Sequence, residues 1–267
     1  MVDSMTGLTW RDLPDHLLSR GTTSFTTADA AELIGGSTTA LYQGLQRLLD
    51  KGELFSPTRG FYVVIAPEFR AWEGSIPAED FIDPMMRHLR RGYYLGLLSA
   101  AQRHGAAHQR PQVTQVMVDH PFRDRTFGRV RIAFYVNSRL DETPTQQAST
   151  RTGRLTVSTP EATVFDLVTR HRDSGGLDNV ATILAELAED EKLDPERLAE
   201  AATVAPASTV HRTGWILDEF VAGFDTGPLA AVVATDSLTA LDPQAGRRGK
   251  VDPKWRVIVN TQIDPDL

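Results

Sequence analysis

Hydrophobic positions recur with a helical period between Thr38 and Asp50. Leu41, Leu45, Leu48 and Leu49 fall on one stripe there, which predicts an amphipathic helix with a buried face. Ser37 is a good N-cap for this helix, and Gly52 ends it because glycine tolerates the left-handed conformation.

The segments around this helix complete a larger unit. A short helix is predicted over 10–20, a strand bridge at Ser24-Phe25, and a helix capped by Thr26 or Thr27 that continues to Leu33, with Gly35-Gly36 as the break after it. Residues 53–55 and 61–65 read as the strands of a hairpin, with a turn at 56–60. Helix, tight turn, capped helix and hairpin follow each other as in a winged helix-turn-helix.

The rest of the chain mixes strand-like and helix-like patterns. Residues 67–80 read as a linker. Helices are predicted at 81–91, 93–104, 179–191, 194–204, 207–223 and 227–233, and strands at 112–118, 128–136, 152–158 and 255–260. A further helix is predicted to begin at Pro160 and to bury Val164, Phe165, Leu167 and Val168. Thr159 caps the helix that begins at Pro160, and residues 237–254 read as a loop before the last strand. Because most strands precede most helices, the expected class is α+β: an N-terminal winged helix-turn-helix and a larger mixed α+β domain.

Charge adds one qualification to this picture. The 267-residue chain has a net charge of −7, so a nucleic-acid-binding face must be local. Residues 66–135 carry ten arginines against seven acidic residues, whereas residues 1–65 carry five basic and seven acidic residues. The middle of the chain is therefore the best place for an anion-binding surface, with Arg87, Arg90, Arg91, Arg103 and Arg110 as its candidates, together with Arg123, Arg125, Arg129 and Arg131.

The absence of cysteine and of long apolar runs limits the expected compartment and cofactors of the protein. There is no cysteine, which excludes disulfides and thiolate metal sites and fits a reducing cytoplasm. No apolar run approaches the ~20 residues of a membrane span, and the first residues do not resemble a secretory signal. We expect a cytoplasmic protein without a membrane segment.

The polar face of the helix at 38–50 is the strongest candidate for function. It presents long hydrogen-bonding side chains and no acid before Asp50, and such side chains can read base edges in the major groove. The hairpin turn adds two residues that can reach the DNA backbone. The predicted DNA-binding residues are Ser37, Thr38, Thr39, Tyr42, Gln43, Gln46, Arg47, Thr58 and Arg59. A merely solvated helix face is the competing interpretation, as is a winged helix that binds only protein, which Asp29, Glu32 and Asp50 would favour.

Enzymatic chemistry has weak support in the sequence. His104 and His108 have the spacing of a metal pair, but Gly105 separates them and no third ligand is placed. Ser99 lacks a nucleophile elbow, and the acidic run at 189–191 reads as a solvated helix end. We expect no catalytic residue, metal or cofactor. A nucleic-acid-processing enzyme with a winged-helix targeting domain stays open as an alternative.

Several long motifs resemble one known family. Residues 24–65 are similar to the N-terminal winged helix of AbiEi-type antitoxins of type IV toxin–antitoxin systems. YYLGLLSAAQRHGAAHQRPQVTQVMV, GRVRIAFYV, TRTGRLTVSTPEATVFDLV and GGLDNVATILAEL resemble the C-terminal domain of that family, in the same order, at 93–118, 128–136, 150–168 and 175–187.

The resemblance implies a function that composition alone does not indicate. It implies a transcriptional autorepressor that binds double-stranded DNA at the repeats of its own promoter. It also implies that the same protein is an antitoxin, which counters a nucleotidyltransferase toxin of AbiEii type without forming a stable complex with it. We therefore expect a winged helix at 1–66, a linker at 67–80 and an α+β antitoxin domain at 81–267. One winged helix reads a small footprint, so we expect a monomer in solution that pairs on DNA.

Overall fold

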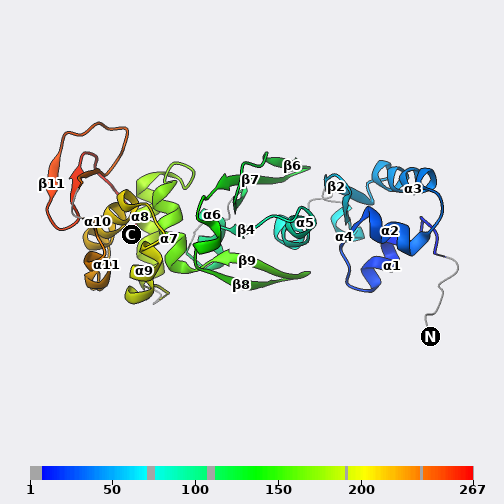
Figure 1. Cartoon of the computed structure of the whole chain (residues 1–267), viewed down its shortest axis with the longest axis horizontal. Helices are drawn as coiled ribbons and strands as arrows, with labels where there is room; N and C mark the ends of the chain where they lie inside the picture. The colour runs from blue at the N-terminus through cyan, green and yellow to red at the C-terminus, as the bar shows by residue number, and fades with distance from the viewer. Residues whose placement is uncertain (1–7, 71–75, 107–111, 190–191, 235–236, 267) are drawn as a thin grey trace.

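The computed structural model describes residues 8–70, 76–106, 112–189, 192–234 and 237–266. The elements follow one another along the long axis of the molecule (Figure 1). The N-terminal helices lie at one end, a six-stranded sheet lies in the middle, and helices and a small sheet form the other end. This mixed α+β architecture agrees with the predicted class.

The N-terminal region is a winged helix-turn-helix. Its three-stranded sheet has the order β1-β3-β2, with Phe25 of β1 paired to Tyr62 of β3. Leu13, Phe25, Leu45 and Leu48 are buried in its core. The elements are α1 (Leu13–Ser19), β1 (Ser24–Thr26), α2 (Thr27–Ile34), α3 (Thr38–Asp50), β2 (Leu54–Thr58) and β3 (Phe61–Val64).

The central sheet has the order β6-β7-β5-β4-β9-β8. β5 runs parallel to β7, β4 runs parallel to β9, and the outer strands pair antiparallel. Its strands are β4 (Tyr93–Leu95), β5 (Thr114–Val118), β6 (Arg125–Phe127), β7 (Val130–Val136), β8 (Thr145–Thr150) and β9 (Gly153–Ser158). Successive side chains face opposite sides, so Tyr94 and Met117 enter one core while Leu95 and Val116 enter the other.

One face of this sheet packs against the winged helix. α5 (Ile82–His88) and the wing strand β3 bury Phe61, Val63, Met85 and Met86 in the same core as Val116. The connection between the two regions is α4 (Pro67–Arg70) and the 3-10 turn η1 (Ala78–Asp80).

The stretch at 67–80, assigned to a linker from its sequence, takes part in this packing where it is described. Ile76 and Ala78 are buried, and the buried Asp80 forms an ion pair with Arg151 of 2.7 Å. The domain limits themselves stay a prediction.

The other face of the sheet supports a helical layer. α7 (Pro160–Thr169) begins at the predicted cap, because the Thr159 side chain accepts a hydrogen bond from the Ala162 N–H at 3.3 Å. The layer contains α6 (Leu97–Arg103), α7, α8 (Gly176–Glu189), α9 (Pro195–Ala202), α10 (Ala207–Phe220) and α11 (Gly227–Ala231), and the turn η2 (Leu140–Glu142) lies beside it. Among the described residues, no helix is both long and apolar enough to cross a lipid bilayer.

Two of the expected helices were wrong in their extent. Residues 93–104 were expected as one helix, but Tyr93–Leu95 form the strand β4 in the middle of the sheet, and the helix α6 begins only after Gly96. A short apolar run is compatible with a helix or a strand. Here Tyr93–Leu95 is a strand because it pairs with β5 on one side and β9 on the other. The expected helix at 81–91 is also shorter, ending at His88.

The segment at 237–254 was expected as a loop, but it contributes two strands. β10 (Thr239–Ala240) and β11 (Lys250–Asp252) flank β12 (Val257–Val259) in a three-stranded sheet. The fully buried Trp255 packs this unit onto α10 beside Gly214, where any Cβ would lie only 2.0 Å from the indole ring. The sheet depends on this tertiary contact, which local sequence does not contain.

Candidate nucleic-acid interface

Helix α3 is held rigidly with one face outward. Leu41, Leu45 and Leu48 are buried, and Gly44 lies against the Trp10 ring. The helix begins at the predicted cap, where the Ser37 side chain accepts a hydrogen bond from the Ala40 N–H at 3.3 Å. An N-cap of this kind contributes about 1 kcal/mol to helix stability. The outward face is therefore presented by a helix that is fixed along its length.

The turn before α3 has the geometry of a helix-turn-helix. Thr26 and Asp29 form a reciprocal capping box at the start of α2. Gly35 and Gly36 have φ values of 71° and 95°, a conformation that favours glycine and reverses the chain between the two helices. Local chemistry thus sets the angle at which α3 leaves α2.

All seven predicted reading residues of α3 and its cap are exposed: Ser37, Thr38, Thr39, Tyr42, Gln43, Gln46 and Arg47. Two of them already have intramolecular partners. The Gln46 Nε2 donates to the Asp50 Oδ1 at 2.8 Å, and the Arg47 Nε donates to the Gln43 backbone oxygen at 3.1 Å. These contacts lie within the helix surface, so a base edge can replace them at small cost. Their role in DNA contact stays a prediction.

The wing is short and tied to the second region. Pro57 cannot donate to the ladder, and the strand register shifts between Phe55 and Thr58. At the tip, the Arg59 backbone oxygen lies 3.1 Å from the His88 Nε2, and Phe61 stacks near the His88 ring. Thr58 is half-buried, whereas the Arg59 side chain is exposed. Sequence reasoning missed the tether, because His88 reads only as a cation in the last turn of its helix.

The predicted arginine surface is divided by ion pairs. Arg87 pairs with Asp83 at 2.8 Å, and the exposed Arg90, two residues after the end of α5, has a φ of 53°. Arg103 pairs with Glu79 at 3.3 Å and also donates to the Ser149 backbone oxygen at 2.6 Å. Arg110 lies outside the described residues.

Arg91 is the most firmly engaged of this set. Its guanidinium contacts the Asp119 carboxylate at 2.7 Å. The hydrogen bond from Arg91 lowers the pKa of Asp119 to about 2, so the pair stays ionised at neutral pH. An arginine held by its own carboxylate is a weaker ligand for phosphate than one without such a partner.

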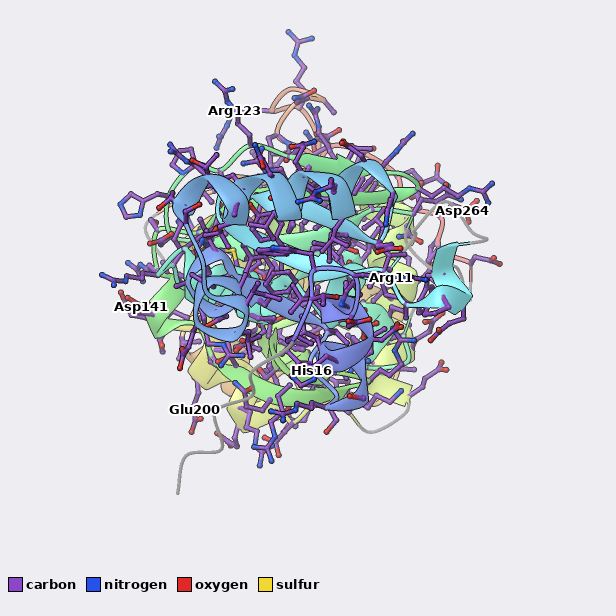
Figure 2. The ribbon with its side chains drawn as sticks, turned by 90° about the vertical axis from the view of Figure 1, so that its right-hand side faces the viewer. Arg11, His16, Arg123, Asp141, Glu200 and Asp264 are labelled. Atoms are coloured by element: carbon purple, nitrogen blue, oxygen red, sulfur yellow. The ribbon has the colours of Figure 1, made fainter. Side chains whose placement is uncertain are left out.

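A second group of arginines lies on a hairpin that contacts the winged-helix sheet. The hairpin of β6 and β7 touches β2 through Phe127, whose ring centroid lies 5.3 Å from that of Phe55. Seen from the end of the winged helix, α3 crosses the upper edge of the molecule and Arg123 projects at the same edge (Figure 2). This hairpin and the loop before it carry Arg123, Arg125, Arg129 and Arg131. Arg123, in the loop before β6, therefore lies on the side of the molecule that α3 occupies.

Ser99 and His104, considered above for catalysis or metal binding, make hydrogen bonds within the fold. The Ser99 hydroxyl accepts the Gln115 N–H at 2.9 Å inside the protein, and the His104 ring hydrogen-bonds to the Ser158 backbone oxygen at 2.8 Å. Over the described part of the chain, no three His, Asp or Glu side chains gather as metal ligands would. His108 and the run at 190–191 lie outside that part.

Comparisons with known proteins bear on both regions. No curated protein matches the sequence. The fold is similar to the crystal structure of the RV2827C protein from Mycobacterium tuberculosis, with a TM-score of 0.66 and 18% identity, over 94% of this chain and 91% of that chain. At this identity the likeness establishes the fold alone. The family model of the AbiEi antitoxin C-terminal domain matches residues 94–219, which span β4 to α10. The chain therefore carries, over residues 94–219, the C-terminal domain of the AbiEi antitoxin family.

Proposed function

We propose that this protein is a DNA-binding transcriptional repressor of its own operon and the antitoxin of a type IV toxin–antitoxin pair. The observation that carries the DNA-binding part is the exposed polar row of α3, from Ser37 to Arg47, which is held over a buried leucine stripe. The antitoxin part rests on the family of residues 94–219.

The side chains of α3 suit direct reading of base pairs. Gln43 has the donor and acceptor pair that matches adenine, and Arg47 has the fork that matches guanine. The first turn, capped by Ser37, offers free backbone N–H groups to a phosphate, which would set the register of the helix in the groove. Thr58 and Arg59 of the wing would contact the flanking backbone.

Affinity would come largely from cations beside the reading helix. Arg123 and Arg131 are exposed on the hairpin that touches β2, and they would neutralise phosphates beyond the footprint of the winged helix. Each neutralised phosphate contributes a slope of about −0.9 to the dependence of log affinity on log salt. Since one winged helix covers few base pairs, we infer that two protomers bind paired repeats, although the free protein is a monomer.

Fluorescence anisotropy with the DNA directly upstream of the gene tests the repressor role, with a scrambled duplex of equal composition as reference. Gln43→Ala or Arg47→Ala is expected to lose about 1–3 kcal/mol of discrimination between the two duplexes. Arg59→Ala and Arg123→Ala are expected to weaken both duplexes alike, and each lowers the salt slope by about one.

Matched control variants separate reading from general charge effects. Gln146→Ala on β8 and Arg172→Ala after α7 change the same residue types at exposed positions away from α3. Both should bind like the wild type. Equal binding of upstream and scrambled DNA by the wild type at two salt concentrations would refute the repressor role.

The antitoxin role is tested separately, by growth of cells that express the neighbouring nucleotidyltransferase gene. The full chain should restore growth, and Arg47→Ala should restore it as well while failing to repress, because the family domain lies outside the winged helix. We also expect no stable complex of the two proteins in gel filtration. A chain that does not rescue growth beside a demonstrated toxin would refute this role.

A protein-interaction module is the second candidate. Tyr42 is 55% exposed in the middle of α3, and Asp29 and Glu32 are exposed on α2. An exposed aromatic side chain suits a protein contact, and the acidic groups of α2 would repel phosphate. Absence of DNA preference in the anisotropy experiment, together with loss of growth rescue in Tyr42→Ala, would favour this candidate.

A further inference from the structure

A cavity of about 220 Å³ lies between the helical layer and the carboxyl ends of β5 and β7. Met117 and Val136 contribute from the strands, Phe165 and Asp166 from α7, and Ala205 from the turn after α9. The carboxyl ends of parallel strands are a common place for ligands in sheets covered by helices. The cavity lies within residues 94–219, far from α3, and has no part in the DNA contact proposed above.

The carboxyl group of Asp166 is only half satisfied. Its Oδ1 accepts a hydrogen bond from the Tyr94 hydroxyl at 3.2 Å. Its Oδ2 is buried, and no donor among the described residues reaches it. Gly96 lies directly beside this oxygen, since a Cβ there would be 3.1 Å away. A buried acceptor without a partner costs about 1–3 kcal/mol, so such an atom calls for an explanation.

The neighbouring polar groups have no donor left for Oδ2. The Asn137 Nδ2 donates to the Tyr94 hydroxyl and to the Thr143 Oγ1, both at 2.9 Å. The Thr143 hydroxyl donates to the Arg139 backbone oxygen at 2.9 Å. Hydrogen-bonding capacity in this network is therefore complete except for one acceptor. A molecule that completes it must bring a donor.

The rest of the wall is mixed, with Ser138 and Thr169 beside apolar side chains that can contact a compact apolar body. Met117, Val136, Phe165 and Ala205 line the cavity with carbon atoms. At the mouth, the Arg170 guanidinium donates to the Val136 backbone oxygen at 3.0 Å and covers the Tyr135 ring. The Arg170 Nη2 donor is therefore engaged by the Val136 backbone oxygen. Buried carboxylates are stabilised in proteins by a cation with hydrogen bonds, which a ligand could supply.

The backbone beside Asp166 is strained. Leu97 follows Gly96 at the start of α6 with a φ of 52°, although it is not glycine and is fully buried. Conformations of this kind cost of order 1–3 kcal/mol and gather at ligand sites. The strain holds the turn that brings Gly96 against the carboxyl group.

We propose that this cavity binds a small organic cation, a compact molecule whose amine or amidine head donates a hydrogen bond to the carboxyl group of Asp166. The apolar body would contact Met117 and Phe165, and the head would complete the network of Tyr94, Asn137 and Thr143. Binding would place a small-molecule ligand inside the domain of residues 94–219.

The protonation of Asp166 gives this site a characteristic pH dependence. Burial raises the pKa of Asp166 to about 7, against the opposing effects of Tyr94 and Arg170. Tyr94 and Arg170 are also the titratable groups that face it from β4 and α7; the lining residues from β5, β7 and α9 are not titratable. A cation binds the ionised form, so affinity should rise by roughly tenfold between pH 6 and pH 8 as the ionised fraction rises.

The test uses the full chain with 4-fluorobenzamidine as the probe and 4-fluorobenzoate as the matched acceptor, each titrated by ¹⁹F NMR at pH 6 and pH 8. We expect the amidine to bind and to bind more tightly at pH 8. Asp166→Asn should weaken it by roughly 30-fold or more, because a buried charged partner is lost. Asp141→Asn, an exposed site elsewhere, should leave binding unchanged.

A second variant separates the cavity from the carboxyl group. Ala205→Leu fills the cavity without touching Asp166 and should also abolish binding; if it fails to fold by circular dichroism, Asp166→Asn and the pH dependence decide. Equal amidine binding by Asp166→Asn would overturn the proposal, and so would absence of binding at both pH values. Preferential binding of the benzoate at pH 6 would overturn it too, since a protonated Asp166 would then be the donor.

Discussion

Replacement of Asp166 by asparagine should make the protein more stable at alkaline pH relative to the wild type. Asparagine has the same shape and can keep the hydrogen bond from Tyr94, but it cannot ionise. In the wild type, burial raises the pKa of Asp166 from 3.8 to about 7 in the folded state. The folded protein therefore holds a proton on Asp166 at pH values where the unfolded chain has released it.

The sign and size of the effect follow from that difference. Because the folded pKa is above the unfolded value, the stability linked to this proton is complete below pH 3.8 and is lost as pH rises through about 7. A shift of about three pKa units corresponds to about 4 kcal/mol in total, of which about 2–3 kcal/mol falls between pH 5 and pH 8. The unpaired amide of the variant costs about 1–3 kcal/mol at all pH values.

Urea unfolding followed by circular dichroism at pH 5, 6.5 and 8 measures this difference. The free energy of unfolding of the variant, minus that of the wild type, should rise by about 2–3 kcal/mol from pH 5 to pH 8. The exposed Asp141→Asn is the control and should show no such trend. A difference between Asp166→Asn and wild type that is constant with pH would refute the account of a buried, protonated carboxyl group.

Two further predictions concern helices that pack a glycine against a tryptophan, and a third concerns the N-cap of α3. Gly44→Ala would place a Cβ 2.2 Å from the half-buried Trp10 ring, so overpacking of about 1–3 kcal/mol should exceed the gain of about 1 kcal/mol in helix propensity, as measured by urea unfolding. Gly214→Ala should cost more than Gly44→Ala in the same assay, because Trp255 is fully buried and cannot move aside. Ser37→Ala should lower stability by about 1 kcal/mol and weaken DNA binding in the anisotropy assay; unchanged values in both would contradict the capping role.

The helix-turn-helix was predictable for a local reason, whereas the wing strand β2 runs on to Thr58, through residues expected in the turn at 56–60. The caps of α2 and α3, at Thr26 and Ser37, satisfy N–H groups only three residues away, and the leucine stripe of α3 needs only one buried side. The helix bounds at Thr38 and Asp50 agree with the prediction. Exposure of the polar face follows from the same pattern, so the candidate reading residues also came from sequence.

Errors lay where distant segments meet. Tyr93–Leu95 was expected as helix because a short apolar run shows no alternation that would mark a strand. Its strand pairing depends on Val157, which lies 62 residues after Leu95 in the chain. The edge strand β8 escaped notice because its residues are mostly polar and exposed. His88 gave no sign of its contact with the wing, since that contact spans 29 residues.

By itself, the sequence determined most of the helices, the turn chemistry before α3 and the family resemblance of this protein, because each depends on neighbours within a few residues or on long contiguous motifs. Only the tertiary structure decided which arginines form ion pairs and where the β6–β7 hairpin lies relative to α3. It also decided that one carboxyl oxygen of Asp166 has no hydrogen-bond partner among the described residues. Tyr94 and Asp166 are 72 residues apart, and Asp166 reads in sequence as an ordinary polar position in a helix. Burial and hydrogen-bond satisfaction depend on every element that packs around a group, and the order of residues along one helix does not contain them.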